Sequence, residues 1–189
     1  MTSTLLAQQS EASPQTILED VFGYQHFRQG QLEVIEASLS GQDSVVIMPT
    51  GGGKSLCYQI PALVHTGLTL VISPLISLMK DQVDQLKADG VAAECVNSTM
   101  SREALISVYN RMRSGDLKLV YVSPERVLMH DFIERLQNIN LSMIAVDEAH
   151  CISQWGHDFR PEYAAIGQLK NYFPHVPFMA LTATRSEER

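Results

Sequence analysis

The sequence predicts an α/β domain in which a single parallel β-sheet carries helices on both faces. Short runs rich in valine, isoleucine and leucine alternate with segments of helical periodicity, such as the one from Leu75 to Leu86. The runs are continuously apolar, so we expect strands that are buried on both faces of the sheet. The six predicted strands are residues 44–48, 68–72, 93–96, 117–122, 143–146 and 178–181.

Length and composition indicate one globular domain. The chain has 189 residues, of which 45% are hydrophobic, enough for one core. We place the domain at residues 13–189, after a polar tail at residues 1–12. No stretch approaches the roughly 18 to 20 apolar residues that a membrane span needs, and no secretory signal is expected. A net charge of −7 argues against a wholly basic binding module, but it permits a local phosphate-binding edge.

The cysteines give no sign of a disulfide framework or a metal site. Cys57, Cys95 and Cys151 are odd in number and irregularly spaced. We therefore expect no zinc in this chain and a reducing cytoplasm as its location.

The turns after three strands predict helix starts at the carboxyl edge of the sheet. Ser73-Pro74 and Ser123-Pro124 each pair a serine N-cap with a proline at the first helical position. A third helix is predicted to begin at Lys54. Unpaired amides at helix starts attract phosphate, although good capping alone also explains the two Ser-Pro turns. Ligands are expected at this edge of the sheet.

The segment "MPTGGGKS" resembles a phosphate-binding loop, with Met48 in place of the first glycine of the general pattern. After Thr50, the glycines at 51–53 allow the backbone to approach a polyphosphate. Lys54 is suited to the β and γ phosphates and Ser55 to Mg²⁺. A glycine-rich turn with an exposed lysine is the alternative, but the preceding strand and following helix favour nucleotide binding. The predicted phosphate-binding residues are Thr50, Gly51, Gly52, Gly53, Lys54 and Ser55.

An acidic pair is predicted at the same edge. A buried strand delivers Asp147 and Glu148, which suit two separate tasks. Asp147 holds Mg²⁺, partly through water, while Glu148 orients and deprotonates the attacking water. A solvated turn is the alternative, and the neighbouring phosphate loop disfavours it.

A polar cluster upstream is a candidate for adenine recognition. The amide of Gln31 offers a donor and an acceptor that match the N6 and N7 edge of adenine. Arg28 lies three residues earlier, which we interpret as the same helical face, and Tyr24 can stack on the base. Phe22 and Phe27 are expected in the core. Ordinary surface residues remain the alternative for this cluster.

These residues belong to a longer series of motifs that resembles the first motor domain of a RecQ-family DNA helicase. The series is "FGYQHFRQGQ", "MPTGGGKS", "SPLISLMKDQV", "SPER", "DEAH", "QWGHDFRPEY" and "LTAT", and it covers about residues 17–184. The DEAH segment alone would suit an RNA helicase as well. The string "CISQWGHDFRPEY" resembles the aromatic-rich loop of RecQ and discriminates between the two.

The resemblance implies a single RecA-like domain and assigns further roles on the DNA side. His150 would link the ATP site to DNA, with an ordinary loop histidine as the alternative. A loop would sense single-stranded DNA through Ser153, Gln154, Trp155, His157, Phe159 and Arg160. The alternative for Trp155 and Phe159 is that they are aromatic residues of the core. Residues that would contact DNA or relay the ATP state are Ser73, Pro74, Ser123, Pro124, Thr182 and Thr184.

The resemblance also implies a whole-protein function. It is ATP-driven unwinding from the 3′ toward the 5′ end, at single strands and duplex junctions, in recombination and repair in the bacterial cytoplasm or nucleoid. A second RecA-like lobe and zinc and winged-helix modules are expected in the complete protein. The segment Ser186-Glu187-Glu188 is typical of a helix start, so we interpret the chain as a first lobe cut from a longer protein. The alternatives are a short ATP- and DNA-binding module without motor activity and, less favoured, a P-loop kinase.

Overall fold

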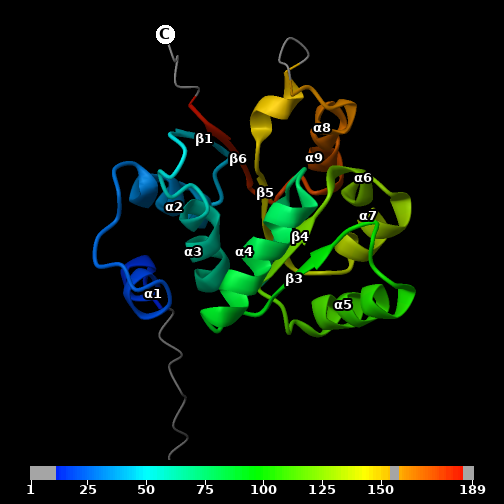
Figure 1. Ribbon diagram of the computed structural model, residues 1–189, viewed down its shortest axis with the longest axis horizontal. Coiled ribbons are helices and arrows are strands. Elements are labelled where there is room, and N and C mark those ends of the chain that lie inside the picture. The colour runs from blue at the N-terminus through cyan, green and yellow to red at the C-terminus, as the bar shows by residue number, and fades with distance from the viewer. Residues whose placement is uncertain (1–11, 154–157, 185–189) are drawn as a thin grey trace, which may run out of the picture.

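A computed structural model describes residues 12–153 and 158–184, and it confirms the parallel sheet (Figure 1). Six strands lie in the order β1-β6-β5-β2-β4-β3, and all of their pairings are parallel. The strands are β1 Ser44–Met48, β2 Leu68–Ile72, β3 Ala93–Val96, β4 Leu119–Val122, β5 Leu141–Val146 and β6 Phe178–Ala183. Every predicted strand is present, with ends that differ by at most two residues.

Helices pack on both faces of this sheet, as predicted. The front face in Figure 1 packs against α3 and α4, and one hydrophobic cluster joins these helices to the strands. A second cluster on the opposite face joins the strands to the helices from α5 to α9. The helices are α1 Pro14–Asp20, α2 Gln31–Leu39, α3 Leu56–Val64, α4 Ile76–Ala88, α5 Arg102–Ser114, α6 Pro124–Val127, α7 His130–Gln137, α8 Pro161–Ile166 and α9 Leu169–Tyr172, with a 3₁₀ turn η1 at Ala149–Ile152.

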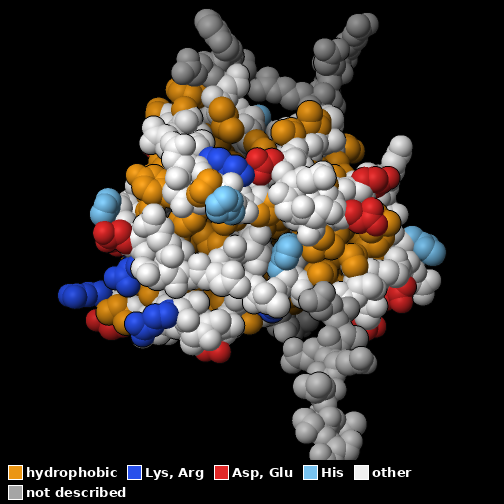
Figure 2. All heavy atoms as spheres, turned by 180° about the vertical axis from the view of Figure 1, so that it is seen from behind, with side chains coloured by type: hydrophobic (Ala, Val, Ile, Leu, Met, Phe, Trp, Pro, Cys, Tyr) orange, Lys and Arg blue, Asp and Glu red, His pale blue; other side chains and the backbone are white. Residues whose placement is uncertain are grey.

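The edge strand β1 corrects the expectation that every strand is buried on both faces. Val46 and Met48 are buried, whereas Val45 is 72% exposed and Ile47 is 62% exposed. The reason is topological, because the described back-face helices pack over β2, β4 and β5 and leave the back of β1 uncovered. Figure 2 shows hydrophobic side chains reaching the surface on this side of the molecule.

Two of the predicted helix starts are also wrong. Helix α3 begins at Leu56, two residues after Lys54, because the glycine-rich loop continues through Ser55. Helix α4 begins at Ile76 with Leu75 at the N-cap, so the Ser73-Pro74 turn does not cap it. The third turn is confirmed, since the Oγ of Ser123 accepts a hydrogen bond from the backbone N of Arg126 at 3.4 Å at the start of α6.

The sheet brings the segments after its strands to one edge. The backbone N of Asp147, just past β5, donates to the carbonyl of Ile72 at the end of β2 at 2.9 Å. Thr184, just past β6, donates in the same way to the carbonyl of Met48 at 3.0 Å. These bonds extend the parallel register beyond the strands, so loops that are distant in sequence meet at the carboxyl edge.

Two further features concern the chain as a whole. Among the described residues no helix is both long and apolar enough to cross a membrane. Cys57, Cys95 and Cys151 are free thiols.

Candidate nucleotide-binding and catalytic site

A cavity of about 710 Å³ lies at this carboxyl edge. Nearly all of the residues predicted to bind the nucleotide or act on it line the cavity, namely Tyr24, Arg28, Gln31, Thr50, Gly51, Gly53, Lys54, Ser55, Asp147 and Glu148. These residues come from three separate segments of the sequence, so the fold alone brings them together. Gly52 is the one member of the predicted set that does not line the cavity.

The glycine-rich loop has a backbone shape that requires glycine. Gly51 and Gly53 have φ values of +76° and +79°, in the left-handed region that other residues rarely adopt. At Gly52 a Cβ atom would lie only 2.8 Å from the carbonyl oxygen of Pro49. Each of the three positions therefore has its own steric reason to be glycine. The resulting turn supplies the close backbone approach that a polyphosphate needs.

The candidate adenine residues hold the loop in this structure. Gln31 is only 1% exposed, and both ends of its amide are bonded. Its Oε1 accepts from the backbone N of Arg28 at 2.7 Å, and its Nε2 donates to the carbonyl of Gly53 at 3.0 Å. The Nη1 of Arg28 donates to the carbonyl of Gly51. These contacts make Gln31 and Arg28 a clamp on the loop.

One detail of the predicted cluster is wrong. Arg28 and Gln31 do not share a helical face, because Gly30 is the N-cap of α2 and Arg28 lies in the turn before it. Tyr24 is exposed in the cavity wall, as a stacking residue must be. Phe22 and Phe27 are partly buried against a hydrophobic cluster, which confirms their predicted packing role.

The acidic pair has an unusual local backbone. Glu148 has a φ of +54°, and it is the one non-glycine residue with positive φ in the described part of the chain. Its backbone N donates to the Oδ1 of Asp147 at 2.9 Å. Burial raises the pKa of Asp147, while this hydrogen bond and the nearby charge of Lys54 act in the opposite direction.

The donor set fits a magnesium ion that is shared with a nucleotide. Within the described residues no cluster of three or more histidine, cysteine or acidic side chains could hold a metal by itself. Mg²⁺ is normally bound through one or two carboxylates together with substrate phosphates, and it keeps several waters. Asp147 and Ser55 line one cavity and offer oxygen ligands of that kind.

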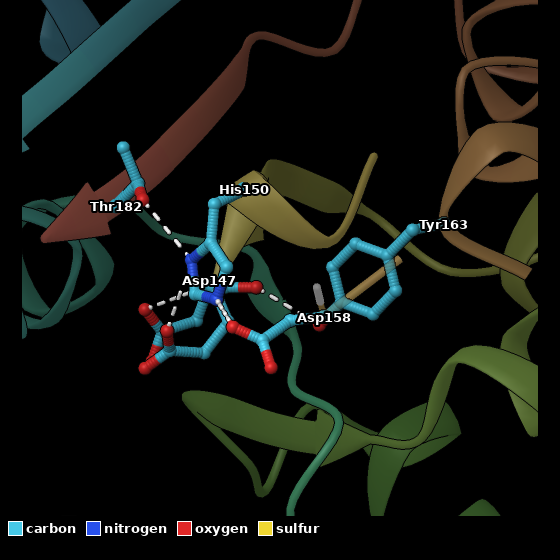
Figure 3. A network of polar contacts seen from close by, with 6 residues as sticks. Asp147, His150, Asp158, Tyr163 and Thr182 are labelled. Atoms are coloured by element: carbon cyan, nitrogen blue, oxygen red, sulfur yellow. Dashed lines mark hydrogen bonds and ion pairs between the residues drawn. The ribbon is translucent and has the colours of Figure 1, made fainter. Parts of the chain in front are cut away.

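His150 connects the acidic pair to two other elements (Figure 3). Its Nδ1 lies 3.1 Å from the Oγ1 of Thr182 on β6 and 3.3 Å from the Oε2 of Glu148. Its Nε2 lies 3.6 Å from the Oδ2 of Asp158. The ring therefore joins the predicted catalytic glutamate, the LTAT segment and Asp158. Its role as a link between ATP and DNA stays a prediction.

The remaining residues of the DNA side are placed differently from one another. Ser73, Ser123 and Pro124 are buried, Pro74, Phe159 and Arg160 are half-buried, and Ser153 and Thr184 are exposed. A direct DNA contact is thus open to the exposed residues, whereas Ser73 and Ser123 are placed to support the strands' ends. Gln154, Trp155 and His157 lie outside the described residues.

Sequence reasoning missed several residues of the site. Asp158 and Tyr163 join the polar network, the latter by donating its hydroxyl proton to the carbonyl of Asp147 at 2.9 Å. Burial raises the pKa of Tyr163, so the hydroxyl stays protonated as a donor. The α4 residues Leu78, Asp81, Gln82, Gln85 and Leu86 and the C-cap residue Asp89 also line the cavity. Their helical spacing carried no signal that could have revealed this.

The fold and the site together define a P-loop NTPase domain of the RecA-like type, with a glycine-rich loop after β1 and an acidic pair after β5. The sequence model of the DEAD/DEAH box helicases matches residues 28–189. The chain belongs to the DEAD/DEAH box helicase family.

Individual relatives support the narrower resemblance. An ATP-dependent DNA helicase RecQ from Pasteurella multocida (strain Pm70) is 62% identical over 168 residues, which are 89% of this chain and 27% of that protein. RecQ from Bacillus subtilis (strain 168) is 52% identical over 176 residues, which are 92% of this chain and 30% of that protein. The predicted resemblance to RecQ is confirmed. The chain spans less than a third of the length of these relatives.

A solved structure supports the fold. The DUF1998 helicase MrfA bound to DNA and AMPPNP matches with a TM-score of 0.74 at 20% identity, over 95% of this chain and 27% of that chain. At this identity the likeness concerns the fold alone.

Proposed function

We propose that the chain is the first, ATP-binding lobe of a RecQ-type ATP-dependent DNA helicase. The observation that carries the proposal is the meeting of the glycine-rich loop and the Asp147–Glu148 pair at one cavity. The 62% identity to a RecQ helicase supports DNA as the polymer on which the complete protein acts. Unwinding would proceed from the 3′ toward the 5′ end at single strands and duplex junctions, in recombination and repair.

The residues of the cavity divide the work of hydrolysis. The backbone of Gly51 to Gly53 and the ammonium of Lys54 bind the phosphates, and Tyr24 stacks on the base. Asp147 and Ser55 would hold Mg²⁺, which neutralises phosphate charge when it is bound. Glu148 accepts a proton from the attacking water. Two observations support this assignment. Gly51 and Gly53 have positive φ values, and all of these residues except Gly52 line the cavity.

The contacts of Gln31 and Arg28 fit nucleotide binding. Both side chains bond carbonyls of the glycine-rich loop, which leaves the amides of the loop for a phosphate. Beyond its two bonds, the amide of Gln31 keeps a second hydrogen and a second lone pair, with which it would read the adenine edge.

The DNA side would report to the same site through His150. Its ring contacts Glu148, Thr182 and Asp158, so a displacement of Asp158 would reach the proposed catalytic carboxylate through one side chain. The second RecA-like lobe would supply arginines to the γ phosphate, and zinc and winged-helix modules would follow it. The bacterial cytoplasm or nucleoid is the proposed location.

The test uses the full-length product of the gene that encodes this chain. We expect ATP hydrolysis that single-stranded DNA stimulates and unwinding of a duplex with a 3′ overhang but not of one with a 5′ overhang. Sequencing the gene beyond codon 189 should reveal an open frame for the second lobe. Binding of ATP and DNA without hydrolysis, together with a stop codon, would instead establish a short non-motor module.

A further inference from the structure

Tyr163 touches the catalytic pair from outside the predicted motifs for ATP. It lies in the first turn of α8, is 1% exposed and packs in the hydrophobic cluster on the back of the sheet. Its hydroxyl donates to the backbone carbonyl of Asp147 at 2.9 Å (Figure 3). That carbonyl belongs to the peptide that joins Asp147 to Glu148. Tyr163 therefore holds the backbone between the two carboxylates through a main-chain atom.

The same peptide is held on its other side. The backbone N of Glu148 donates to the Oδ1 of Asp147 at 2.9 Å. The peptide thus has its carbonyl fixed by Tyr163 and its N–H fixed by the carboxylate next to it. Two hydrogen bonds at opposite ends of one peptide plane set its orientation.

This orientation matters because Glu148 adopts an unfavourable backbone conformation. Its φ of +54° lies in the left-handed region, which a side chain with a Cβ avoids. Such a conformation persists where the surroundings impose it. The direction of the Glu148 side chain depends directly on this φ, so the orientation of the peptide sets where the carboxylate lies beside the cavity.

Tyr163 lies three residues after Arg160, the last residue of the loop predicted to sense DNA. The backbone N of Arg160 donates to the carbonyl of Cys151 at 3.0 Å, so these two residues lie side by side. The backbone N of Tyr163 then donates to the carbonyl of Arg160 at 3.0 Å. One short covalent and hydrogen-bonded path therefore leads from the end of that loop to the Asp147–Glu148 peptide.

We propose that Tyr163 is a positioning residue that holds the Asp147–Glu148 peptide, and with it the Glu148 carboxylate, in the geometry for water activation. The inference rests on the proposed function of the site. It adds a second path between loop and carboxylates, through the backbone, beside the path through the ring of His150. Glu148 remains the group that acts on water, and Tyr163 acts through it.

The test is Tyr163→Phe in the full-length gene product, because phenylalanine keeps the ring and removes the hydroxyl alone. The matched control is Tyr109→Phe. Tyr109 lies in the same hydrophobic cluster, is nearly as buried, and accepts one hydrogen bond, from the Nη2 of Arg126 at 2.6 Å. Each variant loses one hydroxyl group from the same hydrophobic cluster, but Tyr109 is not among the residues that line the nucleotide cavity.

We expect Tyr163→Phe to lower kcat for ATP hydrolysis by about tenfold, with and without single-stranded DNA, as the loss of one orienting hydrogen bond would do. The KM for ATP and the Kd for a fluorescent ATP analogue should stay within about twofold of the wild type, because the glycine-rich loop is untouched. Tyr109→Phe should leave kcat within about twofold. Both variants should have similar melting temperatures.

Three outcomes would refute the role. A kcat equal to that of Tyr109→Phe in an active protein would overturn the positioning by Tyr163 and leave the proposed function intact. A melting temperature far below that of Tyr109→Phe, with KM and kcat both impaired, would assign Tyr163 to packing. An inactive wild type would refute the proposed function and the role of Tyr163 with it.

Discussion

Lys54 and Glu148 line one cavity, and the proposed function gives them different stages of the reaction. In this proposal Lys54 meets phosphate charge that is already present in bound ATP, whereas Glu148 acts on water in the transition state. We expect Lys54→Ala to weaken ATP binding and abolish unwinding in the full-length gene product. Glu148→Gln should keep ATP affinity and lower hydrolysis by about a hundredfold or more. Equilibrium binding and steady-state rates measure the two effects, and equal loss of ATP binding in both variants would contradict the roles.

Gln31 is a case in which the structure adds a condition to a prediction. We expect Gln31→Ala to weaken ATP binding and to reduce the preference for ATP over GTP, because guanine presents O6 where adenine presents its N6 donor. The variant also removes the bond to the carbonyl of Gly53. Competition assays with both nucleotides separate the two effects. If both nucleotides bind more weakly with an unchanged ratio, Gln31 serves the loop and not the base.

Asp147 gives a prediction about stability. Its pKa is raised by burial, so the ionised carboxylate opposes folding at neutral pH. Asp147→Asn should therefore raise the melting temperature at pH 7, and its Oδ1 can still accept from the backbone N of Glu148. The gain should shrink as the pH falls through the raised pKa and vanish below the ordinary value of 3.8, where both states are protonated. A lower melting temperature for the variant at pH 7 would show that the carboxylate stabilises the fold.

At the residue scale, the sequence predicted which residues share the cavity better than it predicted their bonds. The placement of the glycines, Lys54, Asp147 and Glu148 was predictable because their residue types are specific and their strand context was evident. The bonds of Gln31 to the loop and of Tyr163 to the carbonyl of Asp147 were not, because each joins residues that only the tertiary fold brings together. The position of a tyrosine in the sequence does not indicate which backbone atom its hydroxyl will bond.

Asp43 joins three elements at the opposite edge of the sheet. Its Oδ1 accepts from the Nζ of Lys170 at 2.8 Å and from the backbone N of Phe178 at 2.9 Å, so it ties the start of β1 to α9 and β6. We expect Asp43→Ala to lower the free energy of unfolding by about 1 kcal/mol at neutral pH. The matched control is Asp84→Ala, which breaks an exposed pair with Lys80 within α4 and should change stability by less than about 0.5 kcal/mol.

The pH dependence of this link has the opposite sign to that of Asp147. The hydrogen bond from Lys170 is the largest cause that lowers the pKa of Asp43 below 3.8. Its stabilisation is therefore present above that value and is lost as the pH falls through the lowered pKa. Urea unfolding at several pH values measures the difference between wild type and variant. A difference that persists at the lowest pH would assign the effect to packing.

At the element scale, the predictions succeeded where burial is symmetric and failed at boundaries. The apolar runs identified all six strands, because central parallel strands are covered on both faces. The run Val45 to Met48 is equally apolar, yet β1 is an edge strand with one open face. The sequence of one strand does not indicate where that strand lies in the sheet. The Ser73-Pro74 turn failed as a cap because Ser73 is buried and the chain continues for two residues before α4 begins.

At the scale of the whole molecule, the meeting of the site's segments at one cavity was predictable from a rule of topology. Ligands of parallel α/β sheets gather at the carboxyl ends of the strands, and the segments after β1, β2, β4, β5 and β6 align there. The wall from α4 was not predictable, because its residues show only the spacing of an ordinary amphipathic helix. A general rule thus located the site, while its shape required the packed structure.

The last prediction concerns the 189 residues alone. The cavity is lined by the cations Lys54 and Arg28, and Arg28 already bonds the carbonyl of Gly51. Phosphoryl transfer depends on further charge around the γ phosphate, and an arginine supplied by another lobe is typically worth about a thousandfold or more. We therefore expect this chain by itself to bind ATP weakly and to hydrolyse it about a thousandfold more slowly than the full-length gene product, with no stimulation by DNA. Glu148→Gln in the same 189 residues sets the background rate of the assay. Brisk hydrolysis by the isolated chain, stimulated by single-stranded DNA and absent from that variant, would mean that this lobe needs no second one for catalysis.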